Sequence, residues 1–267
     1  MIDVNKRLYK VATPVTQYAF RANLFMWPQR TLFFGPLQHL ALHSMGAVAI
    51  NIGLYQPFLL KPEHGDYQSY RCATIPAGCK HELNAFGGIV ASLIIEKDAP
   101  EYSYFAHCAS GRILGVTNKI EAKWVQCLQK IYEDKLDKVA INTLLNQLFN
   151  TPKATACKVD ARIIEVMQTI QHDPSNDFSQ EYLAASVGLS ASRFRHLFSE
   201  HFDIPYRRYR MWRRVVAAMD ALHKVDNLTY AAMDAGFTDS AHFNRCFRNT
   251  LGVNPSLVFR NMDRFEV

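Results

Sequence analysis

The sequence predicts a multi-domain α+β protein, with a small antiparallel β-barrel and helices in its N-terminal half and an all-α C-terminal domain. Two observations lead to this prediction. Apolar residues recur with a period of two in the first hundred positions and with a spacing of three or four from about residue 118. In addition, one stretch of the C-terminal half is repeated at a period of 48 to 50 residues, which indicates one supersecondary unit used twice.

Composition restricts the class of protein further. Of the 267 residues, 49% are apolar and 20% are charged, so the chain is able to bury a core. The net charge of +6 and the pI near 9.0 are compatible with an anionic partner such as nucleic acid. The polar start is no signal peptide, and no apolar run approaches the about 20 residues of a membrane span. We therefore expect a soluble, cytoplasmic protein with no membrane partner.

The six cysteines are scattered, with no Cys-x-x-Cys pair and no repeated spacing. A disulfide framework or a zinc site needs clustered pairs. We expect free thiols, no structural metal and no cofactor.

Residues 1–117 are expected to form the barrel. In residues 47–54 the large apolar side chains fall at even positions only, which is typical of a strand with one buried face. Residues 70–75 and 89–95 are further runs of apolar and β-branched residues. Turn segments separate these strands at 61–66, 76–78 and 87–88.

Residues 118–150 are expected to form amphipathic helices that serve in linking or dimerisation. Their apolar residues recur every three or four positions, which suits packing on the barrel and dimerisation equally well. Residues 151–157 are the predicted linker, and residues 158–267 the predicted helical domain. The two apolar stripes comprise Ile120, Trp124, Leu128 and Ile131, and Leu136, Ala140, Leu144 and Leu148.

Each copy of the repeat has the pattern of a helix-turn-helix. A short helix ends at Gly188 or Gly236, because glycine readily takes the left-handed conformation that terminates a helix. Leu189 or Phe237 then fills the corner, and Ser190 or Thr238 is expected to cap the next helix. That second helix buries phenylalanines four residues apart, Phe194 and Phe198 or Phe243 and Phe247. Its opposite face would enter the major groove of DNA.

A long helix connects the two units. Nothing interrupts the helical pattern from Pro205 to about Val225, so the helix spans roughly 30 Å at about 1.5 Å per residue. One turn of B-DNA is about 34 Å, so such a helix could hold two recognition helices in successive major grooves.

Charge distribution is more informative than the total charge. Residues 158–267 contain 14 Lys and Arg against 13 Asp and Glu. Arginines nevertheless crowd the first recognition helix and the start of the connecting helix, opposed locally only by Glu200 and Asp203. Such a cluster is able to meet DNA phosphates. Its members are Arg193, Arg195, Arg207, Arg208, Arg210, Arg213 and Arg214.

These residues resemble the AraC/XylS family of bacterial transcription regulators from about Val159 to Arg260. The resemblance rests on Leu183-Ala184, Gly188-Leu189-Ser190, Phe194 and Phe198 in the first unit. In the second unit it rests on Ala231, Ala235-Gly236-Phe237-Thr238-Asp239-Ser240, Phe243, Arg245, Phe247-Arg248, Gly252-Val253-Asn254-Pro255 and Arg260. It implies about seven helices, binding to double-stranded promoter DNA, and activation through contact with RNA polymerase, with repression as the alternative. In the family an antiparallel helical dimer contact often lies in the segment that corresponds to residues 118–150, so the resemblance also implies a homodimer. Tyr230 departs from the family, which usually has Ile or Val there.

The predicted DNA contacts lie on the two recognition helices. Arg195 is expected to read a base, because a guanidinium binds guanine through two hydrogen bonds; the alternative is a phosphate contact or a solvated surface arginine. Asn244 would read adenine or hold a phosphate, and Arg245 would likewise read a base or hold a phosphate. In the family the second unit is often the less sequence-specific one, which favours phosphate for Arg245. Trp212, on the connecting helix, is expected to pack inside the protein rather than to stack on a base. The complete set is Ser192, Arg193, Arg195 and His196 in the first unit, and Ser240, Ala241, His242, Asn244 and Arg245 in the second.

The N-terminal half resembles, more distantly, the cupin-like sensor domains that precede such DNA-binding domains. The segment from Pro76 to Asn84 lies near the second cupin motif, and His39 and His43 lie near the first. The two histidines are four apart rather than two, and the usual nearby glutamate is missing, so we expect no metal. The interior is expected to hold a small-molecule effector instead. His43, Tyr55 and His81 are the pocket candidates, and each is alternatively a structural residue.

The leading hypothesis is therefore a non-enzymatic regulator of transcription. One rival is a cupin metalloenzyme fused to a DNA-binding module. The other is a ligand-independent regulator that a protein partner controls.

Overall fold

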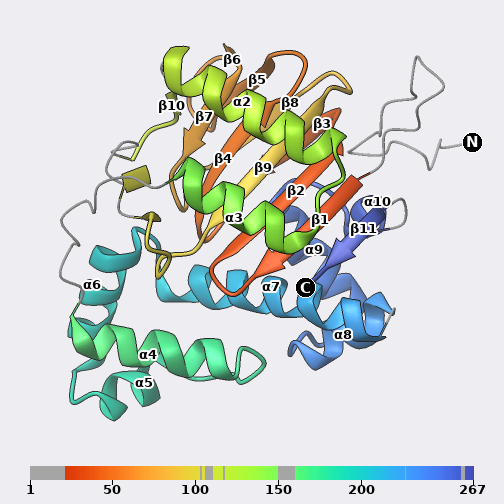
Figure 1. Cartoon of the computed structure of the whole chain (residues 1–267). Helices are drawn as coiled ribbons and strands as arrows, with labels where there is room; N and C mark the ends of the chain where they lie inside the picture. Colours follow the sequence, from red (N-terminus) through yellow and green to blue (C-terminus); the bar gives the residue numbers. More distant parts are fainter. Residues whose placement is uncertain are drawn as a thin grey trace, which may run out of the picture. The chain divides into compact units, whose positions relative to one another are not determined.

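The structure, a computed structural model, describes residues 22–102, 104–105, 111–116, 118–149, 160–225, 227–259 and 262–267. Its contacts divide the chain into two compact units (Figure 1). The first comprises residues 1–154 together with 251–267, and the second comprises residues 155–250. The predicted linker, residues 151–157, and Arg260 lie outside the described residues. None of the described helices is long and apolar enough to cross a membrane.

The strands of the first unit form two sheets, which corrects the prediction of one closed barrel. The larger sheet has the order β10-β7-β4-β9-β2-β1-β11, and the smaller one the order β3-β8-β5-β6. Among the described strands, the edges of the two sheets do not pair with each other. The strands are β1 (Ala22–Trp27), β2 (Arg30–Pro36), β3 (His39–His43), β4 (Val48–Gly53), β5 (Phe58–Pro62), β6 (Gln68–Tyr70), β7 (Cys72–Ile75), β8 (His81–Asn84), β9 (Ile89–Ile95), β10 (Leu114–Gly115) and β11 (Met262–Glu266).

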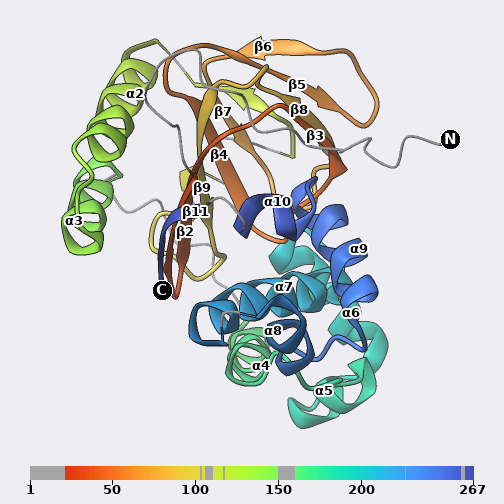
Figure 2. The same ribbon diagram turned by 90° about the vertical axis from the view of Figure 1, so that its right-hand side faces the viewer.

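Strand β4 shows why the sheet need not close. All of its residues are buried, including Asn51 and the other odd positions that the sequence pattern places on an open face. Two helices, α2 (Asn118–Glu133) and α3 (Lys138–Leu148), lie along one side of the larger sheet, and the smaller sheet lies on the other (Figure 2). Cover on both faces buries the apolar surface that closure would otherwise have to bury.

The predicted stripe of α2 lies largely in the core of the first unit, where Trp124, Leu128 and Ile131 are buried with the larger sheet, while Ile120 is 37% exposed. In α3 the buried residues are Ile141 and Leu145, one position after Ala140 and Leu144 of the predicted stripe, and Leu136, Leu144 and Leu148 are partly buried. The structure thus gives these helices an intramolecular role, and dimerisation stays a prediction.

The end of the chain returns to the first unit. Strand β11 pairs in parallel with β1, so the last described residues form an edge of the larger sheet. Arg264 reinforces the pairing, because its Nη1 donates to the carbonyl of Leu136 at 2.8 Å and its guanidinium lies 4.8 Å from the ring centre of Phe25. The prediction of one helical domain up to residue 267 did not include this strand.

The helical part of the chain follows the sequence pattern closely. The connecting helix α7 spans 20 residues, about 30 Å at about 1.5 Å per residue. Trp212 on this helix is 1% exposed and packs, as predicted. The helices are α4 (Ala161–His172), α5 (Gln180–Ser186), α6 (Ala191–Phe202), α7 (Tyr206–Val225), α8 (Leu228–Asp234), α9 (Ser240–Leu251) and α10 (Pro255–Phe259).

Candidate nucleic-acid interface

The two predicted helix-turn-helix units are present as α5–α6 and α8–α9. The turns have the same construction, with Gly188 at φ +67° and Gly236 at φ +84°. In each turn the amide after the glycine donates back five residues, from Leu189 to Ala184 at 2.8 Å and from Phe237 to Ala232 at 3.0 Å. The glycine amides also donate, from Gly188 to the carbonyl of Ala185 and from Gly236 to that of Met233. In each turn the two bonds together form the Schellman ending of a helix, so the sequence repeat corresponds to a structural repeat.

The two recognition helices are capped differently. Ser190 accepts from the amide of Arg193 at 3.2 Å, as predicted for α6. The prediction that Thr238 caps α9 is wrong, because Asp239 immediately precedes the helix and accepts from the amide of His242 at 2.7 Å. That hydrogen bond lowers the pKa of Asp239, since it stabilises the carboxylate. A carboxylate also suits the positive end of the helix dipole better than a hydroxyl does.

Aromatic side chains fix which face of each recognition helix is buried. Phe194 and Phe198 in α6 are fully buried, as are Phe243 and Phe247 in α9. Phe198 also packs against Tyr209 of α7, with ring centres 5.5 Å apart. The opposite faces therefore remain open to a large partner. They expose Ser192, Arg193, Arg195 and His196 on α6, and Ser240, Ala241, Asn244 and Arg245 on α9.

His242 is the half-buried member of the predicted set. Its Nδ1 lies 3.2 Å from the hydroxyl of Thr238, and its ring packs edge-on against Phe237 at 5.4 Å. These contacts give His242 a role in the turn itself, and a phosphate contact by this residue stays a prediction.

The arginine cluster is smaller than the sequence suggests. Arg214 is 6% exposed and donates to three backbone carbonyls, and Arg210 donates to the carbonyl of Phe178 and pairs with Asp177. These two arginines are therefore structural rather than phosphate-binding. Spacing along α7 could not show this, because the loop that they hold lies more than 30 residues earlier in the chain. Arg193, Arg195 and Arg207 remain exposed.

Comparison with known proteins identifies this arrangement. The helix-turn-helix domain family matches residues 183–261. The HTH-type transcriptional activator RhaS of Escherichia fergusonii is 29% identical over 105 residues, which are 39% of this chain and 38% of RhaS. The C-terminal domain is an AraC-type helix-turn-helix domain. An uncharacterised HTH-type transcriptional regulator of Haemophilus influenzae is 28% identical over 98 residues, 36% of this chain and 33% of that protein.

Solved structures extend the likeness beyond the AraC-type domain. A crystal structure of ToxT from Vibrio cholerae covers 91% of this chain and 98% of ToxT, with a TM-score of 0.59 and 10% identity. A second ToxT structure, with an unsaturated fatty acid bound, covers 92% and 98%, with a TM-score of 0.57 and 11% identity. At this identity the likeness shows a shared fold.

Of the three pocket candidates of the N-terminal unit, two lie together and the third lies elsewhere. His43 and His81 are buried side by side with ring centres 4.2 Å apart, and each Nδ1 bonds to the carbonyl two residues earlier. Burial lowers the pKa of His43 well below its usual range and that of His81 to about 4, so both rings are uncharged at neutral pH. Tyr55 is 45% exposed instead and donates to Glu133 at 2.7 Å. Burial and that carboxylate raise the pKa of Tyr55.

The metal ligands that a cupin enzyme needs are not assembled among the described residues. His39, the third histidine of that hypothesis, lies 3.1 Å from Glu82. No three His, Cys, Asp or Glu side chains of the described ranges lie close enough to hold one metal ion.

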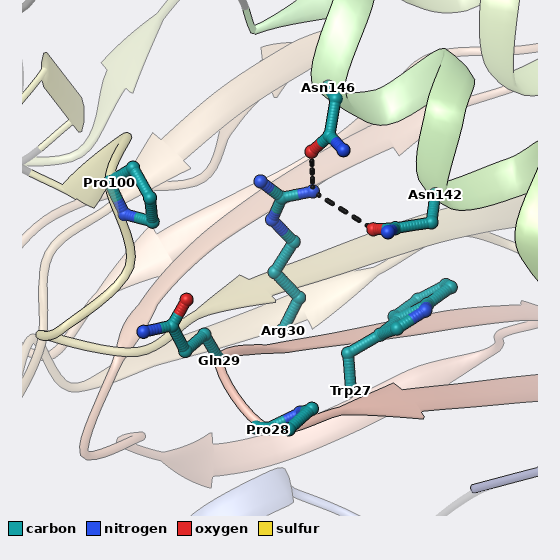
Figure 3. A pocket seen from close by; sticks show the side chains of 7 residues that line it. All are labelled: Trp27, Pro28, Gln29, Arg30, Pro100, Asn142 and Asn146. Atoms are coloured by element: carbon teal, nitrogen blue, oxygen red, sulfur yellow. Dashed lines mark hydrogen bonds between the residues drawn. The ribbon is translucent and has the colours of Figure 1, made fainter.

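A cavity lies at a place that the sequence did not indicate, between the β1–β2 turn and α3 (Figure 3). Its volume is about 320 Å³, and Trp27, Pro28, Gln29, Arg30, Pro100, Asn142 and Asn146 line it. The only sequence signal is a pair of asparagines four residues apart, which share one face of α3. Nothing local connects that pair to Arg30, which lies more than 100 residues earlier.

Arg30 organises the polar side of this cavity. Its Nη1 donates to Asn146 Oδ1 at 2.6 Å and to Asn142 Oδ1 at 3.3 Å, and Glu101 balances its charge. A guanidinium only donates, so it fixes the orientation of both amides and leaves their NH₂ groups as donors. Gln29 donates its own amide N–H to the carbonyl of Asp98, which leaves its side-chain oxygen as an acceptor.

Proposed function

We propose that this protein is a transcription activator that binds double-stranded promoter DNA through α6 and α9 in successive major grooves. The observation that supports it most is the structural repeat, in which two helix-turn-helix units bury the same aromatic face and expose the opposite one. A connecting helix of about 30 Å suits the spacing of one DNA turn. RNA polymerase is the partner that activation requires.

The proposed contacts divide between bases and phosphates. Arg195 and Asn244 are exposed near the middle of their helices, where side chains reach base edges. Arg193, Ser240 and Arg245 are proposed to hold phosphates and so to set the register of the protein on DNA. Ser192, His196 and Ala241 line the same faces.

The test is the selection of bound duplexes from a random DNA pool by the full-length protein, with affinity followed against salt. The proposal expects two sequence blocks about one helical turn apart and an affinity that falls steeply with salt. Failure to select any motif, by the full chain and by a fragment from Lys158 onward, would contradict DNA binding itself. A motif selected only by the fragment would indicate that the N-terminal unit masks the domain.

We also propose that the cavity between the β1–β2 turn and α3, rather than a barrel interior, receives a small effector. Its support is chemical: two amide donors, one amide acceptor and an indole wall, with the only lining charge neutralised by Glu101. Such a surface suits a small uncharged ligand that carries hydroxyl or carbonyl groups.

Thermal unfolding in the presence of neutral sugars, nucleosides and amides tests the effector site. A ligand that binds the folded protein raises the melting temperature with its concentration. The rise should disappear in Asn142→Leu and persist in Gln126→Leu, a control on the outer face of α2. Stabilisation that survives Asn142→Leu would place the ligand elsewhere, and His43 and His81 would be examined next.

A further inference from the structure

One short loop of the C-terminal domain lies between parts of both helix-turn-helix units. It comprises residues 173–178, between α4 and α5, and is called the 173–178 loop below. Asp173 closes it by accepting from the hydroxyl of Ser175 at 2.7 Å and from the amide of Asn176 at 3.2 Å. These bonds lower the pKa of Asp173, because they stabilise its carboxylate.

The connecting helix α7 binds this loop through two arginines and a tyrosine. Arg214 donates to the carbonyls of Pro174 at 3.2 Å, Ser175 at 3.0 Å and Asn176 at 3.3 Å. Arg210 donates to the carbonyl of Phe178 at 3.2 Å, and the Tyr206 hydroxyl donates to the same oxygen at 2.6 Å. Asp177 pairs with both arginines. A buried guanidinium with so many acceptors positions the backbone that supplies them.

The second helix-turn-helix unit contacts the same loop. A Cβ added to Gly236 would lie 2.4 Å from the carbonyl oxygen of Ser175 and 3.0 Å from its Cα. The turn between α8 and α9 therefore touches the loop backbone to backbone. The Ser175 oxygen that Arg214 binds is the atom that Gly236 approaches.

We propose that Arg214 is a positioning residue for DNA recognition: by holding the 173–178 loop, it sets the distance and angle between the two recognition helices. The loop leads directly into α5 of the first unit and supports the turn before α9 of the second. A shift of the loop would move one recognition helix relative to the other without altering the DNA-facing side of either helix. Arg214 would thus determine which separation of the two DNA blocks is accepted.

The inference rests on the proposed function, and the test separates the two. Wild-type protein and variants are compared on duplexes that carry both selected blocks with the wild-type spacing, or with one or two base pairs added or removed between them. A duplex that carries only the first block measures the affinity of the first helix-turn-helix unit alone. The variants are Arg214→Lys, which cannot donate to three carbonyls in a fork, and Asp177→Asn, an exposed substitution that removes the charge shared by Arg210 and Arg214. The control is Asp220→Asn, which breaks only an exposed pair with Lys224 on the same helix.

Wild type and Asp220→Asn should both prefer the selected spacing by about tenfold over a one-base-pair change, a usual effect of one imperfect position. Arg214→Lys should reduce that preference to about twofold or shift it to another spacing, and Asp177→Asn should act in the same direction. Affinity for the single block should stay within about twofold of wild type. An unchanged spacing preference in both variants would overturn the inference. It would also be overturned if Arg214→Lys lost binding to both the two-block and the single-block duplexes while Asp177→Asn kept the wild-type spacing preference. If wild type selects no two-block motif, the proposed function fails instead.

Discussion

Arg195 and Arg214 are chemically identical side chains with opposite surroundings. Arg195 extends from the exposed face of α6 into solvent, whereas Arg214 is buried against three carbonyls. A guanidinium in water is available to a base edge or a phosphate, and a buried one is committed to the fold. At the scale of single residues, burial therefore decides which arginines of the cluster can meet DNA.

Arg195→Ala is expected to weaken binding to the selected duplex by about 1–3 kcal/mol and to relax the preference at one base position. The loss follows from the two hydrogen bonds that a guanidinium makes to guanine. Fluorescence anisotropy with the selected duplex and its single-base variants measures both effects. Lys224→Gln, an exposed cation on α7, is the matched control. Equal weakening on every sequence would make Arg195 a phosphate contact.

The buried pair of His43 and His81 should make stability depend on pH. The pKa of His81 is lowered to about 4, from an ordinary value near 6.5, because burial disfavours the charged ring. Above about pH 6.5 the His81 ring is uncharged in both the folded and the unfolded chain, and the free energy of unfolding has its full value. As the pH falls toward 4, the ring of the unfolded chain takes up a proton first. The free energy of unfolding then decreases, by up to about 3 kcal/mol for His81.

His81→Asn tests this dependence, since its amide can still donate to the carbonyl of Cys79 but does not titrate. Urea unfolding between pH 4 and 7 should show a flatter loss of stability in this variant than in wild type. His64→Asn changes an exposed histidine and should leave the slope as it is. An unchanged slope in His81→Asn would assign the pH dependence to other groups.

At the scale of elements, the two turns have the same backbone but different neighbours. Both Gly188 and Gly236 lie in the left-handed region. Around Gly188 the position of a Cβ is open, with no atom within 4 Å, whereas at Gly236 it would meet the Ser175 backbone. The first turn therefore requires glycine for its conformation alone, and the second requires it for conformation and for close approach.

Substitution by alanine should separate these two requirements. Gly188→Ala is expected to lower stability by about 1 kcal/mol, the cost of a left-handed alanine. Gly236→Ala should cost clearly more, because the 173–178 loop has to move. Differential scanning calorimetry of the two variants and of wild type measures the shift in melting temperature that each substitution causes. Equal shifts would mean that the loop yields easily, and would weaken the positioning role given to it.

At the scale of the whole molecule, the chain does not divide at one point. Contacts group residues 251–267 with the N-terminal unit, and β11 completes the edge of the larger sheet beside β1. Edge strands carry unpaired N–H and C=O groups, so the outer edge of β1 depends on β11 for its partners.

Removal of residues 262–267 should therefore destabilise the N-terminal unit and increase aggregation, because β1 becomes an open edge that lacks the Arg264 contacts. Light scattering during heating and the melting temperature measure the two effects. Arg264→Ala, which keeps the strand, should cause a smaller change. A truncated protein that melts and scatters like wild type would show that β11 contributes little.

The parts of this protein that sequence determined are those held by short-range interactions. The glycine turns, the Ser190 cap and the 20-residue α7 depend on bonds between residues at most five apart, so pattern and residue type predicted them. The cap at Asp239 was not predicted, because Thr238 and Asp239 are adjacent and both residue types are able to cap a helix. Strand positions at 89–95 and the helices after residue 118 followed from periodicity for the same reason.

Tertiary structure alone decided how distant segments meet. The open sheets, the β1–β11 pair, the Arg214 loop contacts and the cavity around Arg30 join residues that are about 40 to more than 200 positions apart. Such contacts form because separate elements bury apolar surface against one another, and hydropathy patterns state which face is buried but not against what. The same limit explains why two arginines assigned to DNA bind a loop of the fold instead, and why the candidate effector cavity was not predicted.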